Sequence, residues 1–271
     1  MTRFIKINYV SCLLAILPST AAFGYSRVQT SQGADVHWPQ AKVTVQRDSS
    51  FPSTQLTDEQ AQKALQAALD AWSTLPDSHI QLARGADAPD PTAQGSTPTL
   101  NFVRFRQSDW PYAHTMLAYT QLFTHPKSGE IVAAMIEVNE QDNHFFGPDD
   151  MPSHASNLYD LQAVLTHEMG HLIGLGHSDE SAATMYRSTA PFDTHQRTPI
   201  EDDRLGVTTI YPQSTDGGSE PDPAPTTLPA HGCSIGAKGS ADGQVGSALL
   251  VALTILGMAL VRSRKQSASA A

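Results

Sequence analysis

The sequence predicts an α+β fold for residues 25–212, with separate segments at both ends of the chain. Five short runs in this region have the alternating or β-prone pattern of strands, and three stretches repeat apolar residues at helical spacing. Apolar residues make up 40% of the chain, and Gly and Pro number 18 each, which suits one folded domain with extended flanks. The composition changes after Pro212, where the apolar periodicity ends.

The expected strands are short; one precedes the first expected helix in the sequence and the others follow it. Residues 42–47 (KVTVQR) alternate between apolar and polar side chains, as in a half-buried strand. The other expected strands are residues 79–84, 99–105, 116–123 and 131–138. Residues 85–98 are rich in Ala, Asp, Pro and Gly and predict a surface loop. A Ser-Gly turn signal connects the last two strands.

Three helices are expected, each with a capping signal. Residues 57–72 place Leu65, Leu69 and Trp72 at helical spacing after the candidate cap Thr57. The second helix should begin at the candidate N-cap Asn157, which has an acidic residue three positions later, and should end near Gly174. The third should run from Thr198 towards Tyr211, because Thr198 and Glu201 form a capping-box pattern with Pro at the first helical position.

Residues 1–24 have the layout of a secretory signal peptide. Arg3 and Lys6 precede an apolar run that ends at Leu17, and the small residues Ala21, Ala22 and Gly24 are plausible cleavage sites. The alternative is a membrane anchor that is not cleaved, for which the apolar run is short.

The C-terminal part divides into a linker and a tail. Residues 213–232 are rich in Pro, Ser, Thr, Gly and Asp and predict a flexible linker. The tail, residues 233–271, contains a continuous apolar or small-residue span at 245–261, followed by a basic cluster. Both cysteines, Cys12 and Cys233, lie in these end segments, so a disulfide within the domain is excluded. The net charge of −10, with no basic cluster between the termini, argues against a nucleic-acid partner.

The most specific pattern in the chain is a set of histidines in and after the second expected helix. His167 and His171 are four residues apart, so both imidazoles would lie on one helix face and could bind one metal ion. Glu168 follows the first histidine, where its carboxylate could reach a metal-activated water. Gly174 would let the chain leave the helix, and His177 would then supply a third nitrogen. Three protein ligands leave one coordination position open, which is typical of a catalytic zinc site.

This motif, with Ser178 after the last histidine, resembles that of the metzincin zinc peptidases and specifically of the matrixin-like branch. The segment from Ala183 to Tyr186 is similar to the Met-turn of that family, with Met185 beneath the metal. The resemblance covers about residues 36–211 and is strongest from 160 to 186. It implies a twisted mixed sheet, a long active-site helix and a C-terminal helix, with a cleft between two subdomains. It also implies a zinc-dependent metalloendopeptidase in which Glu168 is the general base towards a zinc-activated water.

The same resemblance implies where protein or peptide substrates bind. The strand at 116–123 would be the edge above the cleft, and Leu117, Ala118, Tyr119 and Thr120 would pair with an extended substrate. A plain sheet edge is the alternative. Residues 187–198 should line the pocket for the substrate residue that follows the scissile bond. Their sequence does not indicate which substrate side chain this pocket prefers.

The chain also departs from the animal matrixins. No cysteine lies between Cys12 and Cys233, which excludes a thiol latch on the zinc within the domain. A second, structural zinc site is not recognisable, and histidines 114, 125, 144 and 154 are expected to be surface or loop residues. Loop carboxylates at Asp142, Asp149 and Asp150 could bind calcium, although a solvated acidic loop explains them equally well.

Two alternatives to a peptidase are an inactive binding module that keeps the fold and a hydrolase of non-peptide bonds. Retention of Glu168 and all three histidines disfavours the first, and His177 with the Met-turn disfavours the second.

The tail resembles the sorting tags of myxosortase-type systems, in which Gly-Cys precedes an apolar span and a basic cluster. That resemblance implies a secreted or cell-surface protein on the outer surface of a Gram-negative bacterium, whose tail meets membrane or sorting machinery. An ordinary transmembrane anchor remains open, since the span is at the lower limit of bilayer thickness.

Overall fold

A computed structural model describes residues 24–50, 52–87, 101–150, 157–213 and 226–227. The predicted signal peptide up to residue 23, His154, Cys233 and the tail therefore lie outside the described residues. Within the described part, no helix is long and apolar enough to cross a membrane.

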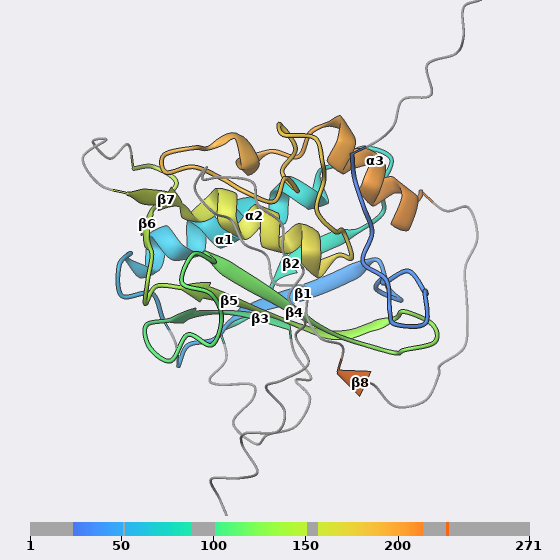
Figure 1. Cartoon of the computed structure of the whole chain (residues 1–271), viewed down its shortest axis with the longest axis horizontal. Coiled ribbons are helices and arrows are strands. Elements are labelled where there is room, and N and C mark those ends of the chain that lie inside the picture. The colour runs from blue at the N-terminus through green and yellow to red at the C-terminus, as the bar shows by residue number, and fades with distance from the viewer. Residues whose placement is uncertain (1–23, 51, 88–100, 151–156, 214–225, 228–271) are drawn as a thin grey trace, which may run out of the picture. The chain divides into compact units, whose positions relative to one another are not determined.

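A mixed β-sheet forms one layer of the domain (Figure 1). Its order is β2-β1-β3-β5-β4-β8, in which β2, β1, β3 and β5 are parallel and β4 is antiparallel to β5. The strands are β1 (Lys42–Arg47), β2 (Gln81–Arg84), β3 (Asn101–Arg106), β4 (Ala118–Thr124), β5 (Ile131–Asn139) and the two-residue β8 (Thr226–Thr227). The mixed sheet with its helices confirms the predicted α+β fold class.

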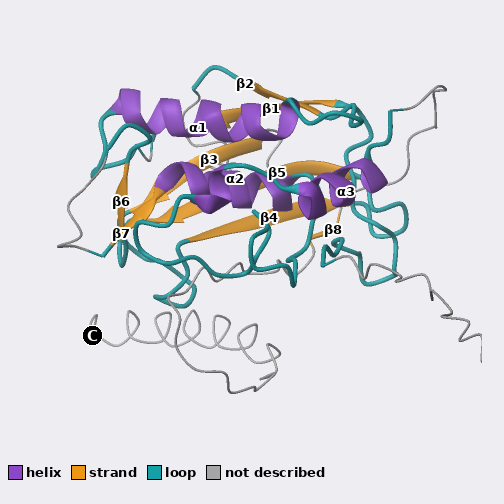
Figure 2. Ribbon diagram, turned by 90° about the horizontal axis from the view of Figure 1, so that it is seen from above, coloured by secondary structure: helices purple, strands orange, loops and turns teal. Residues whose placement is uncertain are grey.

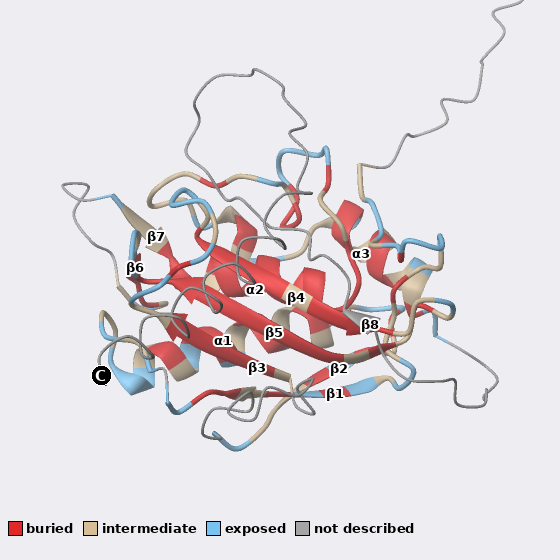
Figure 3. Cartoon of the chain, turned by 60° about the horizontal axis from the view of Figure 1, so that its bottom comes forward, coloured by how far each residue is buried: buried red, intermediate tan, exposed pale blue. Residues whose placement is uncertain are grey.

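The helices α1 (Asp58–Ser73) and α2 (Leu161–Leu172) lie on the same face of this sheet (Figure 2). Their inner faces bury Leu65, Leu69 and Trp72 from α1 together with Val164 and Leu165 from α2. The facing strands are buried along most of their length (Figure 3). The helix α3 (Glu201–Ile210) follows a 3₁₀ turn at His195–Arg197. The predicted cap of α1 is confirmed, because the Thr57 side chain accepts a hydrogen bond from the Gln60 backbone.

The start of the second helix was predicted wrongly. Residues Leu158–Asp160 form a strand, β7, which pairs in parallel with β6 (His144–Phe146). The helix therefore begins at Leu161, and Asp160 is its N-cap, accepting a hydrogen bond from Ala163 N at 3.1 Å. The predicted end is confirmed, since Gly174 has φ +94° directly after the helix.

The predicted capping box at Thr198 and Glu201 was also wrong. The third helix begins at Glu201, and Asp203 accepts a hydrogen bond from Ile200 N at 2.9 Å. In the predicted linker, β8 pairs antiparallel with Phe123 and Thr124 of β4. The remaining length of β4 has no described strand on its outer side.

Candidate zinc site

The helix α2 carries two of the three predicted ligands and is buried on almost every side. His167 and Glu168 are fully buried and His171 is 5% exposed. The helix is held against α1 by the Trp72 indole, whose Nε1 donates to Thr166 O at 2.7 Å. A helix enclosed in this way holds its side chains in fixed directions, which is what a metal site requires.

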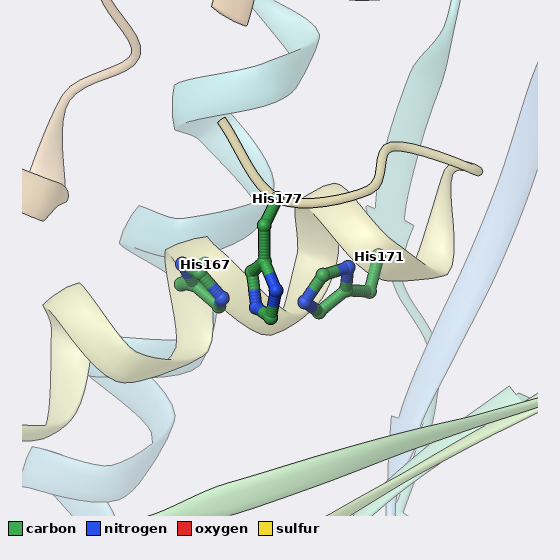
Figure 4. A group of neighbouring side chains, drawn as sticks. All are labelled: His167, His171 and His177. Carbon is green, nitrogen blue, oxygen red and sulfur yellow. The ribbon is translucent and has the colours of Figure 1, made fainter. Parts of the chain in front are cut away.

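The structure brings His167, His171 and His177 together, as the sequence predicted (Figure 4). One nitrogen from each imidazole lies within 4.8 Å of the others. The ring centroids are 4.9 Å, 5.4 Å and 4.9 Å apart for the pairs 167–171, 167–177 and 171–177. Among the described residues this is the one group of three potential ligands. Three imidazoles at this spacing suit a tetrahedral zinc ion with one position left open.

The hydrogen bonds of two rings indicate which nitrogen would bind the metal. His167 Nδ1 lies 2.7 Å from Thr184 O, and His171 Nδ1 lies 2.7 Å from Leu175 O. A carbonyl oxygen can only accept, so each Nδ1 carries the proton and each Nε2 keeps its lone pair for a metal. Burial also lowers the pKa of His167 to about 3, which keeps this ring neutral at physiological pH. The residues present therefore fit zinc.

Met185 lies directly against the helix between the two histidines. A Cβ built on Gly170 would be 2.1 Å from Met185 Sδ, so only glycine leaves room for the sulfur. The turn from Ala183 to Met185 is buried, and its Thr184 carbonyl is the partner of His167. The predicted Met-turn thus contacts the metal-binding helix through both a side chain and a carbonyl.

Two adjacent carboxylates at the start of α3 hold the loops around the site, and neither was predicted from the sequence. Asp203 accepts from Thr184 N at 2.8 Å and from Met185 N at 3.0 Å. Asp202 accepts from the Ser178 hydroxyl at 2.7 Å, next to His177. Burial raises the pKa of Asp203, while its backbone N–H donors oppose that rise. Carboxylates in a first helical turn are normally explained by the helix dipole, so no sequence pattern indicates these bonds to distant segments.

Glu168 is positioned by the edge strand of the sheet. Thr120 Oγ1 donates to Glu168 Oε2 at 2.5 Å, and both residues are buried. Thr120 was predicted to pair with an extended substrate, and its side-chain hydroxyl contacts Glu168, the predicted general base. The hydroxyl fixes one carboxylate oxygen relative to the histidines on the same helix.

The other predicted substrate-binding residues divide between the two faces of the sheet. The side chains of Leu117 and Ala118 belong to the core beneath the helices. Tyr119 points to the opposite face, where its ring lies 3.9 Å from that of Tyr112. The opposite directions of Ala118 and Tyr119 follow from strand alternation, whereas Leu117 precedes β4. The side chain of Tyr119 is therefore directed away from the histidines, although its backbone lies on the sheet edge.

The loop between the Met-turn and α3 is fastened to the helix that it covers. Arg197 Nε is paired with the buried Asp160 carboxylate at the start of α2. Gln196 Nε2 donates to Tyr186 O at 2.7 Å, and Gln196 is fully buried. A cavity of about 680 Å³ borders His171 and His177 and is lined in part by residues 24–29.

The remaining predicted residues lie outside this site. His114 and His144 are exposed, and His125 is half-buried in the loop after β4. Asp149 pairs with Lys63, while Asp150 accepts from Gln60 and from Gly147 N. Asp142 accepts from Asn139. Calcium at these carboxylates stays a prediction.

Comparison with known proteins agrees with this geometry. A sequence profile named Matrixin matches residues 37–212. Metalloendoproteinase 1-MMP of Arabidopsis thaliana is 43% identical over 63 residues, which are 23% of this chain and 17% of that protein. Metalloendoproteinase 1 of Glycine max is 40% identical over 63 residues, 23% of this chain and 20% of that protein. Neutrophil collagenase of Homo sapiens is 34% identical over 92 residues, 32% of this chain and 20% of that protein.

The matched stretches thus span about a fifth of each relative at most. The family profile covers more than half of the chain and includes all three histidines, Glu168 and Met185. The chain belongs to the matrixin family of zinc metallopeptidases.

Proposed function

We propose that this protein is a zinc-dependent metalloendopeptidase that hydrolyses peptide bonds of protein substrates. The observation that carries the proposal is the triad of His167, His171 and His177, with ligand nitrogens within 4.8 Å of one another, next to a buried glutamate. Two of the rings have Nδ1 bound to a carbonyl, which leaves Nε2 for the metal. The three histidines would hold the zinc, and Met185 would pack beneath it.

Glu168 would act as the general base. When bound, zinc supplies Lewis acidity that polarises the scissile carbonyl and acidifies the attacking water. Glu168 takes the proton of that water and returns it to the leaving amine, so one carboxylate serves both halves of the reaction. Thr120 holds Oε2 of this carboxylate at 2.5 Å, which limits the positions that the base can occupy. Thr120 is therefore a positioning residue in this mechanism.

The outer edge of β4 would bind the substrate main chain. From Ala118 to Leu122 this edge faces no described strand, so its backbone groups can pair with an extended peptide. Thr120 lies in the middle of that stretch, and its side chain reaches Glu168. A peptide added antiparallel to β4 would consequently pass the catalytic carboxylate. Leu117 to Thr120 contribute through their backbone in this arrangement.

Cleavage of an unfolded protein tests the proposal. The full chain loaded with zinc should cut casein at internal peptide bonds, lose this activity on chelation, and regain it when zinc is restored. Mass spectrometry of the products should identify peptides whose new N- and C-termini lie at bonds inside the casein sequence. Zinc binding without cleavage would indicate an inactive binding module. Cleavage of ester substrates with no effect on casein would indicate a hydrolase of another bond.

We further propose that the protein is exported by residues 1–23 and processed near Cys233. Gly24 N donates to Asp202 Oδ1 at 2.7 Å, so Gly24 is part of the folded domain, which favours cleavage before it. The basic residues after the apolar span should stay cytoplasmic and leave Cys233 outside. Mass spectrometry of the mature termini in the native host should find chain ends near residues 24 and 233. A C-terminal peptide containing Val261 would indicate a plain anchor.

A further inference from the structure

The first described residues of the chain run alongside the loop that carries His177. Residues Gly24–Val28, which we name the N-terminal strap, lie antiparallel to this loop, with Arg27 opposite Leu175. Val28 N donates to Gly174 O at 2.8 Å, and Gly176 N donates to Ser26 O at 2.9 Å. Asp179 N donates to Gly24 O at 3.0 Å. The strap is thus bonded to the loop on both sides of His177.

A side-chain bond from the strap reaches the third histidine itself. Ser26 Oγ donates to His177 O at 2.6 Å. The two segments are so close that a Cβ on Gly176 would lie 2.4 Å from Ser26 Oγ. The position of the His177 backbone is therefore coupled directly to that of Ser26.

The far end of the strap is fixed to α3. One oxygen of Asp202 accepts from Gly24 N at 2.7 Å, and the other accepts from the Ser178 hydroxyl at 2.7 Å. A Cβ on Gly24 would lie 2.7 Å from Glu180 N, so this end also packs tightly. One carboxylate therefore holds both the strap and the residue after His177.

The three histidines differ in what holds them. His167 and His171 belong to α2, which is enclosed by α1, the sheet and the loop before α3. His177 lies on a loop after the helix, where the backbone is ordered by its bonds to neighbouring segments. Loops are usually less well fixed than helices, so a metal ligand on a loop needs such support.

We propose that the N-terminal strap positions the third zinc ligand, with Ser26 as its positioning residue. This inference rests on the proposed function, because it takes His177 to be a zinc ligand. Loosening the strap should let His177 move away from the ion and so speed the release of zinc. The other two ligands should be unaffected.

Zinc release from the zinc-loaded full chain into an excess of a chromophoric chelator tests this assignment without any activity measurement. Ser26→Ala should release zinc about fivefold faster, the effect expected from losing one hydrogen bond. Ser31→Ala is the matched control, because Ser31 is an exposed serine in the turn just after the strap. It should release zinc at the wild-type rate. Equal rates for wild type and Ser26→Ala would overturn the proposal.

A second pair of variants tests the contact from the side of the loop. Gly176→Ala places a methyl group against Ser26 Oγ, so it should push the strap and the loop apart and release zinc faster than Ser26→Ala. Gly176→Ala/Ser26→Gly removes the collision and should bring the rate back towards that of Ser26→Ala. Equal rates for the single and double Gly176 variants would show that the strap does not act on His177. Absence of zinc from the wild type would instead defeat the proposed function.

Discussion

Thr120 Oγ1 donates a 2.5 Å hydrogen bond to Glu168 Oε2, joining the edge strand of the sheet to the metal-binding helix. Thr120 is 3% exposed and Glu168 is fully buried, so water does not compete for this bond. This hydrogen bond therefore links the strand that would bind substrate to the carboxylate that would act on water.

Thr120→Val should lower kcat at least about tenfold and leave zinc content unchanged, because hydrogen bonds to charged groups are stronger than ordinary ones. Thr124→Val is the matched control on the same strand, since the buried Thr124 hydroxyl has no hydrogen-bond partner among the residues that the structure describes. Steady-state kinetics on a peptide substrate would check both variants. An equal loss of activity in the two variants would show that the loss comes from disturbing the strand and not from losing the hydrogen bond to Glu168.

Gly170→Ala should destabilise the domain by about 1–3 kcal/mol, the usual cost of overpacking a core. The added methyl group would meet Met185 Sδ and the Trp72 ring. Urea unfolding of Gly170→Ala, Met185→Ala and the double variant would form a double-mutant cycle. The double variant should lose less stability than the sum of the single changes. Strictly additive losses would mean that the two residues are not in contact.

His177→Ala should abolish stoichiometric zinc binding, because His167 and His171 alone provide two of the three nitrogens. His144→Ala is the control, since His144 is exposed and lies outside the triad. Elemental analysis after dialysis measures the result. Full zinc occupancy in His177→Ala would show that His177 is not a zinc ligand.

The zinc-free protein should lose stability as the pH falls below about 6.5. Burial lowers the pKa of His167 from an ordinary value of 6.5 to about 3. Between these values the unfolded chain binds a proton that the folded chain does not, so stability falls as the pH drops, by about 1.4 kcal/mol per pH unit. Urea unfolding at pH 7.5, 6 and 5 would test this. His167→Gln should have a shallower slope than wild type, and identical slopes would contradict the assignment.

Much of the fold and of the site could be predicted because the signals are local. The alternation in residues 42–47 gave the bounds of β1, and the cap of α1 depends on residues three apart. The triad was likewise predictable, because His167 and His171 share a helix face and Gly174 permits the turn to His177.

The features that were missed depend on contacts between distant segments. Asn157 has the pattern of an N-cap, but pairing of β7 with β6 keeps Leu158–Asp160 extended. Thr198 and Glu201 match a capping box, yet the helix begins later, where Asp203 accepts backbone hydrogen bonds from both the helix start and the Met-turn. No local pattern indicates that Thr120 would meet Glu168, since the two residues come close only when the sheet packs on α2.

Replacement of Glu168 tests the central claim most directly. Glu168→Ala leaves all three imidazoles in place, so the purified variant should still bind one zinc ion per chain. Its turnover of casein should fall at least about a hundredfold, because the general base is missing. Elemental analysis and cleavage assays on the same preparation provide both quantities. Retained zinc with lost cleavage is the predicted result. Near-wild-type cleavage by Glu168→Ala with zinc bound would contradict the account.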